Sequence, residues 1–468
     1  MRSSIPWSFL HSLAGRGRRA LCLACFLVVA GPGAAAAQNA HWWTNQYGNR
    51  ARLLGGAVIG SASDLSAVYY NPGALALVEQ PEALLTGYVF DLESLAIKGL
   101  FAPENKISST RLGAVAGLIA GEIRLKFLGR TRLAYSFLTR HLFEYRLGGS
   151  AQVLGEEVGL PEITELAGSV RLEERLSEYW GGLTWALPVH ERVGVGLTLF
   201  GGNRNQRGRF SSDLVAVAGQ QAGLAVNLRD YSYDHWRLLL KLGVRVTLTD
   251  SWTGGLTVTT PSLRLFGGGS VAYNSTAVAG GLSQAAVSFQ EDIPSSYRNP
   301  LSIGAGAAYT GERWTLHLAA EWFEGLDLIV LDAEPFEAQT TGEIIDPNVN
   351  HRLDPILNVG VGASRQWNEW LSGYANFHTD FGGAESGRNS QTTTALWDLY
   401  SFGAGAIFAV DRSEFTLGVV YSLGSNETIE GLSFVPGLPA ESGTASLDYS
   451  RWTFILGFNL AFGSGGEE

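Results

Sequence analysis

The stretch Arg451-Trp-Thr-Phe-Ile-Leu-Gly-Phe-Asn-Leu-Ala-Phe462 decides the fold class. Its even positions, from Trp452 to Phe462, are all large and apolar, and its odd positions are mostly small or polar. Residues that alternate in this way, with a period of two, indicate a β-strand with two different faces. The second face is small and carries few charges. That combination is typical of a strand that lies between lipid and the inside of a membrane barrel.

The same alternation recurs many times along the chain, for example at 301–310, 314–322, 357–364 and 415–423. Counting such segments from about residue 82 to residue 462 gives roughly fourteen strands, an even number as bacterial barrels require. The sequence therefore predicts an all-β fold, a transmembrane antiparallel β-barrel over residues 81–463. A β-propeller is the alternative, because short turns recur at roughly 45 to 60 residues, but the signature dipeptides of propeller blades are missing.

The predicted connections alternate between short and long. Tight turns are expected near 188–191, 249–251, 310–312, 367–369 and 410–413, and long polar loops near 150–167, 203–226, 268–296, 327–350, 382–396 and 425–445. Outer-membrane barrels have short periplasmic turns, long outer loops and aromatic girdles at both interfaces. Five tryptophans lie beside the short turns and fit the periplasmic girdle: Trp185, Trp252, Trp314, Trp367 and Trp370.

The N-terminus has the composition of an export signal. Arginines precede an apolar run of about ten residues that ends at Gly31-Pro32, and Ala35 and Ala37 provide a cleavage site, which predicts a signal peptide over residues 1–37. A lipoprotein acceptor at Cys25 is the weaker alternative. Beyond this segment no run reaches 18 apolar residues, so membrane-spanning helices are not expected. A membrane chain without such helices must be a closed barrel.

The charge and cysteine content exclude several functions. Removal of residues 1–37 leaves 29 basic and 44 acidic residues, a net charge of −15, which argues against nucleic acid as a partner. Both cysteines lie in the predicted signal peptide, so we expect no thiolate metal site, no cofactor and no cysteine nucleophile. His378 and Asp380 share one face of a predicted strand and suggest a hydrolase dyad, although a structural hydrogen bond is the commoner role of such a pair.

Residues 38–80 do not alternate like the rest, and they contain Asp64-Leu-Ser66-Ala-Val-Tyr-Tyr-Asn71-Pro72-Gly73-Ala-Leu75. Asn71 followed by Pro72 predicts a capped helical turn. This stretch resembles the N-terminal hatch of the FadL/TodX-type outer-membrane transporters, which carry Asp-x-Ser-x-x-x-x-Asn-Pro-Ala-x-Leu near the mature N-terminus. Gly73-Ala replaces the usual Ala-Gly. A second stretch, residues 294–322, is also similar to that family.

The resemblance implies a fourteen-stranded barrel whose interior is plugged by residues 38–80, followed by a short C-terminal tail, residues 464–468. It also implies passive uptake of hydrophobic molecules, such as long-chain fatty acids or aromatic hydrocarbons, which pass a pocket beside the hatch and leave sideways at a kinked third strand. The implied ligand-binding and hatch residues are Asp64, Ser66, Asn71, Pro72, Gly73 and Leu75. The expected surroundings are outer-membrane lipid, and the expected state is a monomer.

Four polar residues of predicted strands should point inward: Lys241, Arg245, His317 and Glu321. They either bond the hatch or form a ring that selects solutes. Relatives of the same fold also act as carriers in type 9 secretion, and the fold alone does not choose between the two functions. A barrel enzyme is a third possibility, for which the sequence offers no convincing catalytic residues.

Overall fold

The structure is a computed structural model that describes residues 41–78, 84–85, 88–98, 106–125, 129–154, 164–219, 221–279, 282–383, 397–410, 413–426 and 446–460. The predicted signal peptide and C-terminal tail lie outside these residues. Three short helices precede the strands: α2 (Asn49–Leu53), α3 (Ala67–Tyr70) and α4 (Pro72–Leu75). No helix among the described residues is long and apolar enough to cross a bilayer.

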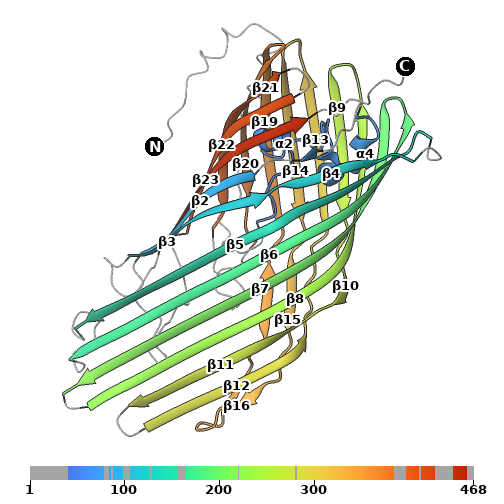
Figure 1. The fold of residues 1–468 in the computed structure, drawn as a ribbon. Coiled ribbons are helices and arrows are strands. Elements are labelled where there is room, and N and C mark those ends of the chain that lie inside the picture. Colours follow the sequence, from blue (N-terminus) through green and yellow to red (C-terminus); the bar gives the residue numbers. More distant parts are fainter. Residues whose placement is uncertain are drawn as a thin grey trace, which may run out of the picture. The chain divides into compact units, whose positions relative to one another are not determined.

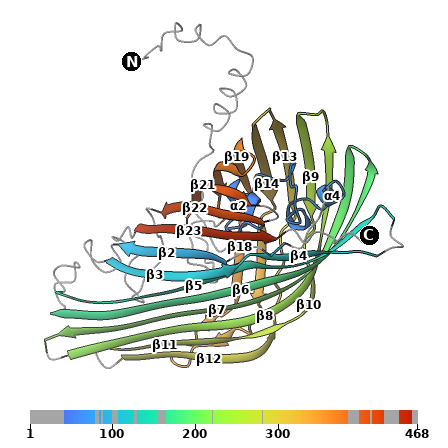
Figure 2. The same ribbon diagram turned by 45° about the horizontal axis from the view of Figure 1, so that its top comes forward.

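Antiparallel strands form nearly all of the remaining structure, as Figures 1 and 2 show. They are β1 (Leu84–Leu85), β2 (Tyr88–Lys98), β3 (Lys106–Ala116), β4 (Leu118–Ile123), β5 (Arg132–Val153), β6 (Glu165–His190), β7 (Val193–Ala218), β8 (Gln221–Thr247), β9 (Trp252–Thr259), β10 (Leu263–Phe266), β11 (Gly268–Ala279), β12 (Leu282–Pro294), β13 (Ser302–Thr310), β14 (Trp314–Phe323), β15 (Leu326–Leu331), β16 (Phe336–Glu337), β17 (Ile344–Ile345), β18 (Val349–Leu353), β19 (Ile356–Asn368), β20 (Leu371–Asp380), β21 (Leu399–Val410), β22 (Ser413–Asn426) and β23 (Ser446–Leu460).

One large sheet contains all of these strands except β15 to β18, which form two small sheets. Neighbours along the chain are mostly neighbours in the sheet, and β9 connects the long strands to the short ones by pairing with both β8 and β13. Strand β2, near the start of the sheet, is hydrogen-bonded to the last strand, β23, over ten residue pairs. The prediction of an all-β fold built on an antiparallel sheet is therefore confirmed.

The two faces of the sheet differ as the alternation predicts. In β23, Trp452, Phe454, Leu456 and Phe458 are all exposed, whereas Arg451 and Ile455 on the other face are buried. In β14, Trp314, Leu318 and Trp322 are exposed, whereas His317, Ala319 and Glu321 are buried. The exposed face is thus large and apolar, which suits contact with lipid. The buried face, called the inner face below, packs on residues 41–78.

Two of the long loops predicted from the sequence, near 203–226 and 268–296, are mostly β-strand in the structure. Residues 203–226 continue β7 and β8, which stay paired as far as Ala218 and Gln221. Residues 268–279 and 282–294 form β11 and β12, which pair with each other, and β11 also pairs with β8. The range 327–350 contains β15 to β17 and the first residues of β18, and the ranges around 155–163, 384–396 and 427–445 lie outside the described residues. Strands β5 to β8 therefore reach 22 to 27 residues and run far past the short strands (Figure 1).

The core lies between the inner face and residues 41–78, the described part of the predicted hatch. Most of its apolar side chains are buried, including Tyr47, Leu54, Leu65 and Leu75. Helix α4 packs on β6, β7 and β8, and α2 packs on β20 and β21. These strands lie on different parts of the sheet, so the sheet curves around the hatch (Figure 2).

Candidate functional site

The hatch motif is folded by its own polar side chains. The Asp64 carboxylate accepts a hydrogen bond from the backbone N–H of Ser66, at 2.8 Å. The Asn71 side-chain oxygen accepts from the N–H of Gly73, and Pro72 is the first residue of α4. This is the capped turn expected from the sequence, although it ends at Leu75. Asn71 also donates to the carbonyls of Ile59 in the hatch and Val244 in β8, at 2.8 and 2.9 Å.

Glycines explain why the hatch fits so closely against the inner face of the surrounding strands, which we call the wall. A Cβ added to Gly73 would lie 2.6 Å from the carbonyl oxygen of Gly243 and 2.7 Å from that of Gly194. A Cβ added to Gly196 would lie 2.5 Å from the carbonyl oxygen of Pro72. Atoms at these distances overlap, so Gly73 is required where the usual motif has Ala. Small residues on the inner face are thus the docking surface of the hatch.

All four inward-pointing residues expected from the sequence contact the hatch. Glu321 accepts a hydrogen bond from the Trp43 indole at 2.9 Å, and the Lys241 ammonium lies 3.8 Å from Glu321 and 5.0 Å from the centre of the Tyr69 ring. His317 shares a hydrogen bond with Ser61 at 2.8 Å, and Arg245 donates to the carbonyl of Ala62 at 3.3 Å. Each wall residue therefore holds a different segment of the hatch.

Asp380 fixes the first described residues of the hatch. Its carboxylate accepts hydrogen bonds from the Trp43 N–H at 2.9 Å, the Thr44 hydroxyl at 2.6 Å and the Asn358 side chain at 3.1 Å. His378 is buried on the same face, where it contacts Asn376. Asp380 thus takes the structural role that the sequence analysis weighed against a hydrolase dyad.

The wall has a break beside this part of the hatch. Strand β5 pairs with β4 only up to Leu138, has a bulge at Arg140, and beyond it pairs with β6 alone among the described strands. On the other side, Gly117 separates β3 from β4. Two hatch side chains bond the freed carbonyls of β5: Tyr47 donates to Thr139 at 2.9 Å, and Asn45 donates to Arg140 at 3.1 Å. Burial raises the pKa of Tyr47 to about 12.

Two cavities flank the same hatch segment, and both are lined by Asn45 and Gln46. The first reaches the break in the wall, and its lining includes Gly117, Thr139 and Arg451. The second is rich in aromatic rings and is lined by Trp42, Trp43, Tyr69, Tyr70, Lys241 and Glu321, among others. Its free volume is about 10 Å³, the room of one water molecule, so an apolar ligand can enter only when these side chains move apart.

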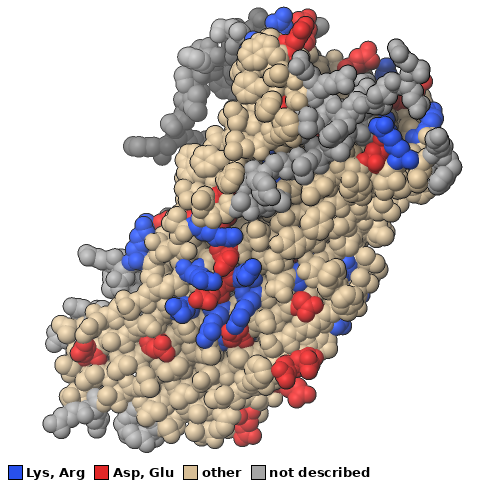
Figure 3. All heavy atoms as spheres, viewed as in Figure 1, with Lys and Arg blue, Asp and Glu red and all other residues tan. Residues whose placement is uncertain are grey.

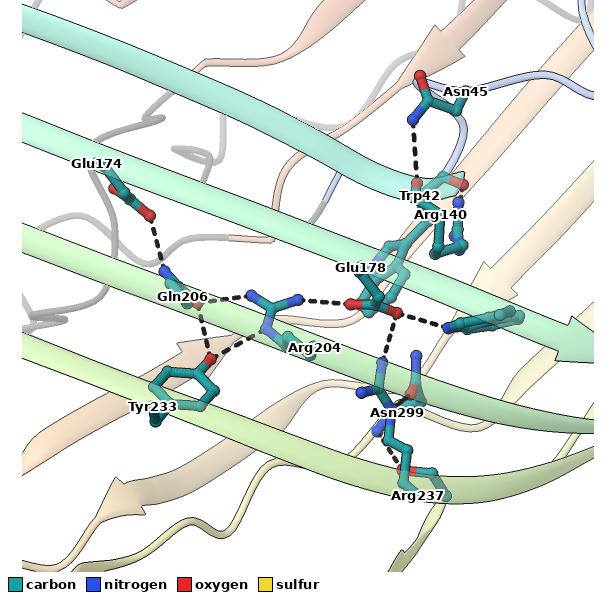
Figure 4. A network of polar contacts seen from close by, with 12 residues as sticks. Trp42, Asn45, Arg140, Glu174, Glu178, Arg204, Gln206, Tyr233, Arg237 and Asn299 are labelled. Carbon is teal, nitrogen blue, oxygen red and sulfur yellow. Dashed lines mark hydrogen bonds and ion pairs between the residues drawn. The ribbon is translucent and has the colours of Figure 1, made fainter. Parts of the chain in front are cut away.

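A buried polar network lies further along β6 to β8 and was missed by the sequence analysis (Figure 4). Glu178 forms ion pairs with Arg204, at 2.9 Å, and with Arg237, and all three side chains are fully buried. Arg237 also bonds Asn299, and the Arg204 guanidinium lies 4.2 Å from the centre of the Tyr297 ring. The network therefore fixes the segment after β12 against the wall. The sequence contained one signal for this network, because its charged residues stand at inward positions of segments in which inward and outward residues alternate.

Comparisons with known proteins identify the fold. No family model matches the sequence, and no curated protein matches it. One solved structure similar to this chain is a TodX deltaS2S3 mutant, described as a monoaromatic hydrocarbon channel. It is 14% identical, the match covers 90% of this chain and 100% of that chain, and the TM-score is 0.59. The toluene transporter TodX of Pseudomonas putida is 13% identical, with coverages of 90% and 100% and a TM-score of 0.55. A FadL homologue of Pseudomonas aeruginosa is 13% identical, with coverages of 93% and 100% and a TM-score of 0.52.

These likenesses show the fold. It is that of the FadL/TodX-type β-barrel proteins, as the hatch motif indicated. The solved structures named here are channels and transporters rather than enzymes. That the barrel has about fourteen strands stays a prediction from the sequence.

Proposed function

We propose that this protein is an outer-membrane channel through which small hydrophobic molecules, such as aromatic hydrocarbons or long-chain fatty acids, diffuse without an energy source. The observation that carries the proposal is the break between β3 and β5, which lies beside a cavity and is covered by hatch residues. The similar solved structures include channels titled for monoaromatic hydrocarbons and toluene.

The route follows from the position of the aromatic cavity. An apolar molecule would rest among Trp42, Trp43 and Tyr69, pass the Asn45–Gln46 segment, and reach the first cavity at Gly117. Release through the wall delivers the molecule to the apolar part of the membrane, where its transfer from water is favourable. Such a route requires the hatch segment to move away from β5, which it contacts through the hydrogen bonds of Asn45 and Tyr47 and through the Arg140 guanidinium, a donor to the Trp42 carbonyl at 2.7 Å.

In this proposal the hatch seals the interior, and the motif residues Asp64, Ser66, Asn71, Pro72, Gly73 and Leu75 keep it in place rather than touching the ligand. We treat the chain as a transporter without catalytic function. No contact described above favours the secretion-carrier alternative, which co-purification of a secreted partner would support.

The decisive experiment closes the break with a bulky side chain. Gly117→Trp should fill the cavity and slow the entry of radiolabelled toluene into proteoliposomes at least several-fold. Gly181→Trp is the matched control, because a Cβ at Gly181 meets nothing within 4 Å. Equal toluene entry in wild type and in folded Gly117→Trp would contradict the proposed route.

Deletion of residues 40–76 tests the seal separately. The described strands remain, so the barrel should assemble, and small sugars should enter the proteoliposomes faster. Unchanged sugar permeability in the folded deletion variant would show that the hatch does not close the interior.

A further inference from the structure

The outward surface of the long strands β5 to β8 changes from apolar to charged residues at one position along the strands. On β6 the outward residues Leu187, Trp185, Leu183 and Tyr179 are exposed and apolar or aromatic over nine positions. That is the length with which a tilted strand crosses a bilayer. Tyr179 of β6 and Trp236 of β8 both lie opposite Asn203 of β7, so they stand in one row across the sheet. They fit an aromatic girdle at the outer edge of an apolar band.

Beyond this row the same surface carries arginines in adjacent rows. The strand register sets Arg175 of β6 opposite both Glu144 of β5 and Arg207 of β7. The next row joins Arg146, Glu173, Arg209 and Asp230, and the row after that contains Arg171. Figure 3 shows these charges gathered in the middle of an otherwise largely uncharged surface.

Positive charge is in excess within the three rows, which we call the arginine patch. The patch has five arginines, Arg146, Arg171, Arg175, Arg207 and Arg209, and three carboxylates, Glu144, Glu173 and Asp230. Arg207 and Arg209 share Asp230, at 3.0 and 3.9 Å. Asp234 and Asp213 flank the patch on either side. The whole chain has a net charge of −11, so this excess of positive charge is local.

The pair Arg175 and Arg207 is the strongest sign that an anion belongs here. Like charges directly opposite each other on neighbouring strands are unfavourable. Arg207 pairs with Asp230 and Arg146 pairs with Glu144, yet their side chains are 61% and 73% exposed. Each guanidinium group has five N–H donors, so N–H groups that the carboxylate does not use can still reach a ligand in front of the sheet. A guanidinium group donates two parallel hydrogen bonds to a phosphate.

We propose that the arginine patch binds the phosphate groups of the glycolipid in the outer leaflet, lipopolysaccharide. This inference rests on the outer-membrane placement proposed above. A phosphate at the head of a lipid lies just beyond the acyl chains, and the patch begins about four residues, or roughly 13 Å of strand, beyond Tyr179. The acyl chains of the same lipid would contact the apolar band. Charge and position thus select one partner, a phosphorylated lipid seated on the outside of β5 to β8.

The test compares two double variants of the full-length protein. Arg175→Gln with Arg207→Gln removes the opposed pair. Arg192→Gln with Arg313→Gln removes the same charge from two short turns at the opposite end of the strands. Native mass spectrometry counts lipopolysaccharide molecules retained per protein in detergent. Titration with bisphosphorylated lipid A, and with lipid A from which both phosphates were removed, then measures the phosphate contribution.

We expect the wild type and the turn variant to retain lipopolysaccharide and to bind the bisphosphorylated form at least about tenfold more tightly, the effect of one or two charge-assisted hydrogen bonds. The patch variant should lose both properties, and replacement of Arg175 and Arg207 by lysine should restore only part of them. Equal retention in both glutamine variants would overturn the proposal, as would equal binding of phosphatidylglycerol and lipid A. Heat-modifiable mobility and toluene entry, measured on the same samples, show whether such a failure concerns the patch alone or the membrane placement itself.

Discussion

The long strands β5 to β8 and the short strands β13, β14 and β19 to β22 belong to one sheet, yet their inner faces differ. On the short strands glycine and alanine alternate with apolar outward residues, and the hatch lies directly on them; a Cβ at Gly306 would lie 2.7 Å from the backbone nitrogen of Gly60. On the long strands, beyond the hatch, the inner face carries buried arginines and glutamates.

The difference follows from what each inner face must contact. A separate segment of backbone packs best against a wall without side chains, because close packing leaves no room for them. Beyond the hatch the wall meets the segment after β12, and Glu178, Arg204 and Arg237 bond it there. Close packing at glycine positions thus dominates where the sheet meets the hatch, although Glu321, Lys241 and Asp380 also contact the hatch region there, and buried ion pairs dominate beyond it.

The largest effect is expected where the long strands depend on charge. Glu178→Ala leaves two buried guanidinium groups without their anion, and removal of one partner of a buried ion pair costs about 3–5 kcal/mol. The temperature at which the unboiled protein loses its compact gel mobility should fall accordingly. Glu173→Ala on the outer surface of the same strand is the control, with an effect of about 1 kcal/mol or less. Similar shifts for both variants would refute the role of the network.

Arginine substitutions on β6 and β23 locate the apolar band on the outward surface of a long strand and of a shorter one. Leu183→Arg on β6 and Leu456→Arg on β23 should each cost about 2–4 kcal/mol if they lie near the middle of the bilayer. Ser177→Arg, on the same face of β6 but beyond Tyr179, should cost almost nothing. Unfolding in urea from lipid vesicles measures all three. A large loss at Ser177 would place the edge of the band further out.

The shape complementarity of the hatch is tested at Gly243. A Cβ there would overlap the side-chain oxygen of Asn71 and the ring of Pro72, so Gly243→Val should displace the hatch at a cost of about 1–3 kcal/mol. Proteoliposomes with this variant should also become permeable to small sugars. Gly181→Val meets no neighbouring atom and serves as the control. A tight, fully stable Gly243→Val protein would contradict the close fit.

The smallest effect is expected at the break. Tyr47→Phe removes one hydrogen bond to Thr139, worth about 0.5–1.5 kcal/mol, and should speed toluene entry while leaving the sugar permeability unchanged. Tyr135→Phe, on the exposed face of β5, is the control. A slower toluene entry in Tyr47→Phe would indicate that the hydroxyl assists passage instead of restricting it.

The fold class was predictable because lipid demands an apolar outer face at every second residue. The same demand explains the errors. Beyond the bilayer both faces of a strand tolerate polar residues, so the alternation fades over 203–226 while the hydrogen bonds of β7 and β8 continue. The Asn71 cap was predictable because its partners are local. The Glu178 network was not, because its members come from three strands and meet only through a register that no single strand reveals.

The pairing of β2 with β23 has a consequence for the order of events during folding. Asp91 and Thr453, which share a hydrogen bond across this seam, are 362 residues apart in the chain. Contacts of such long range are slow to form, because the loss of chain entropy precedes any compensating contact. If the chain is exported as the proposed outer-membrane function requires, the hatch crosses the inner membrane first and waits unenclosed until almost the whole chain has followed. Its many apolar side chains, buried in the finished protein, are in that interval exposed to water, so the newly exported chain depends on a holding chaperone more than a barrel with an empty interior does.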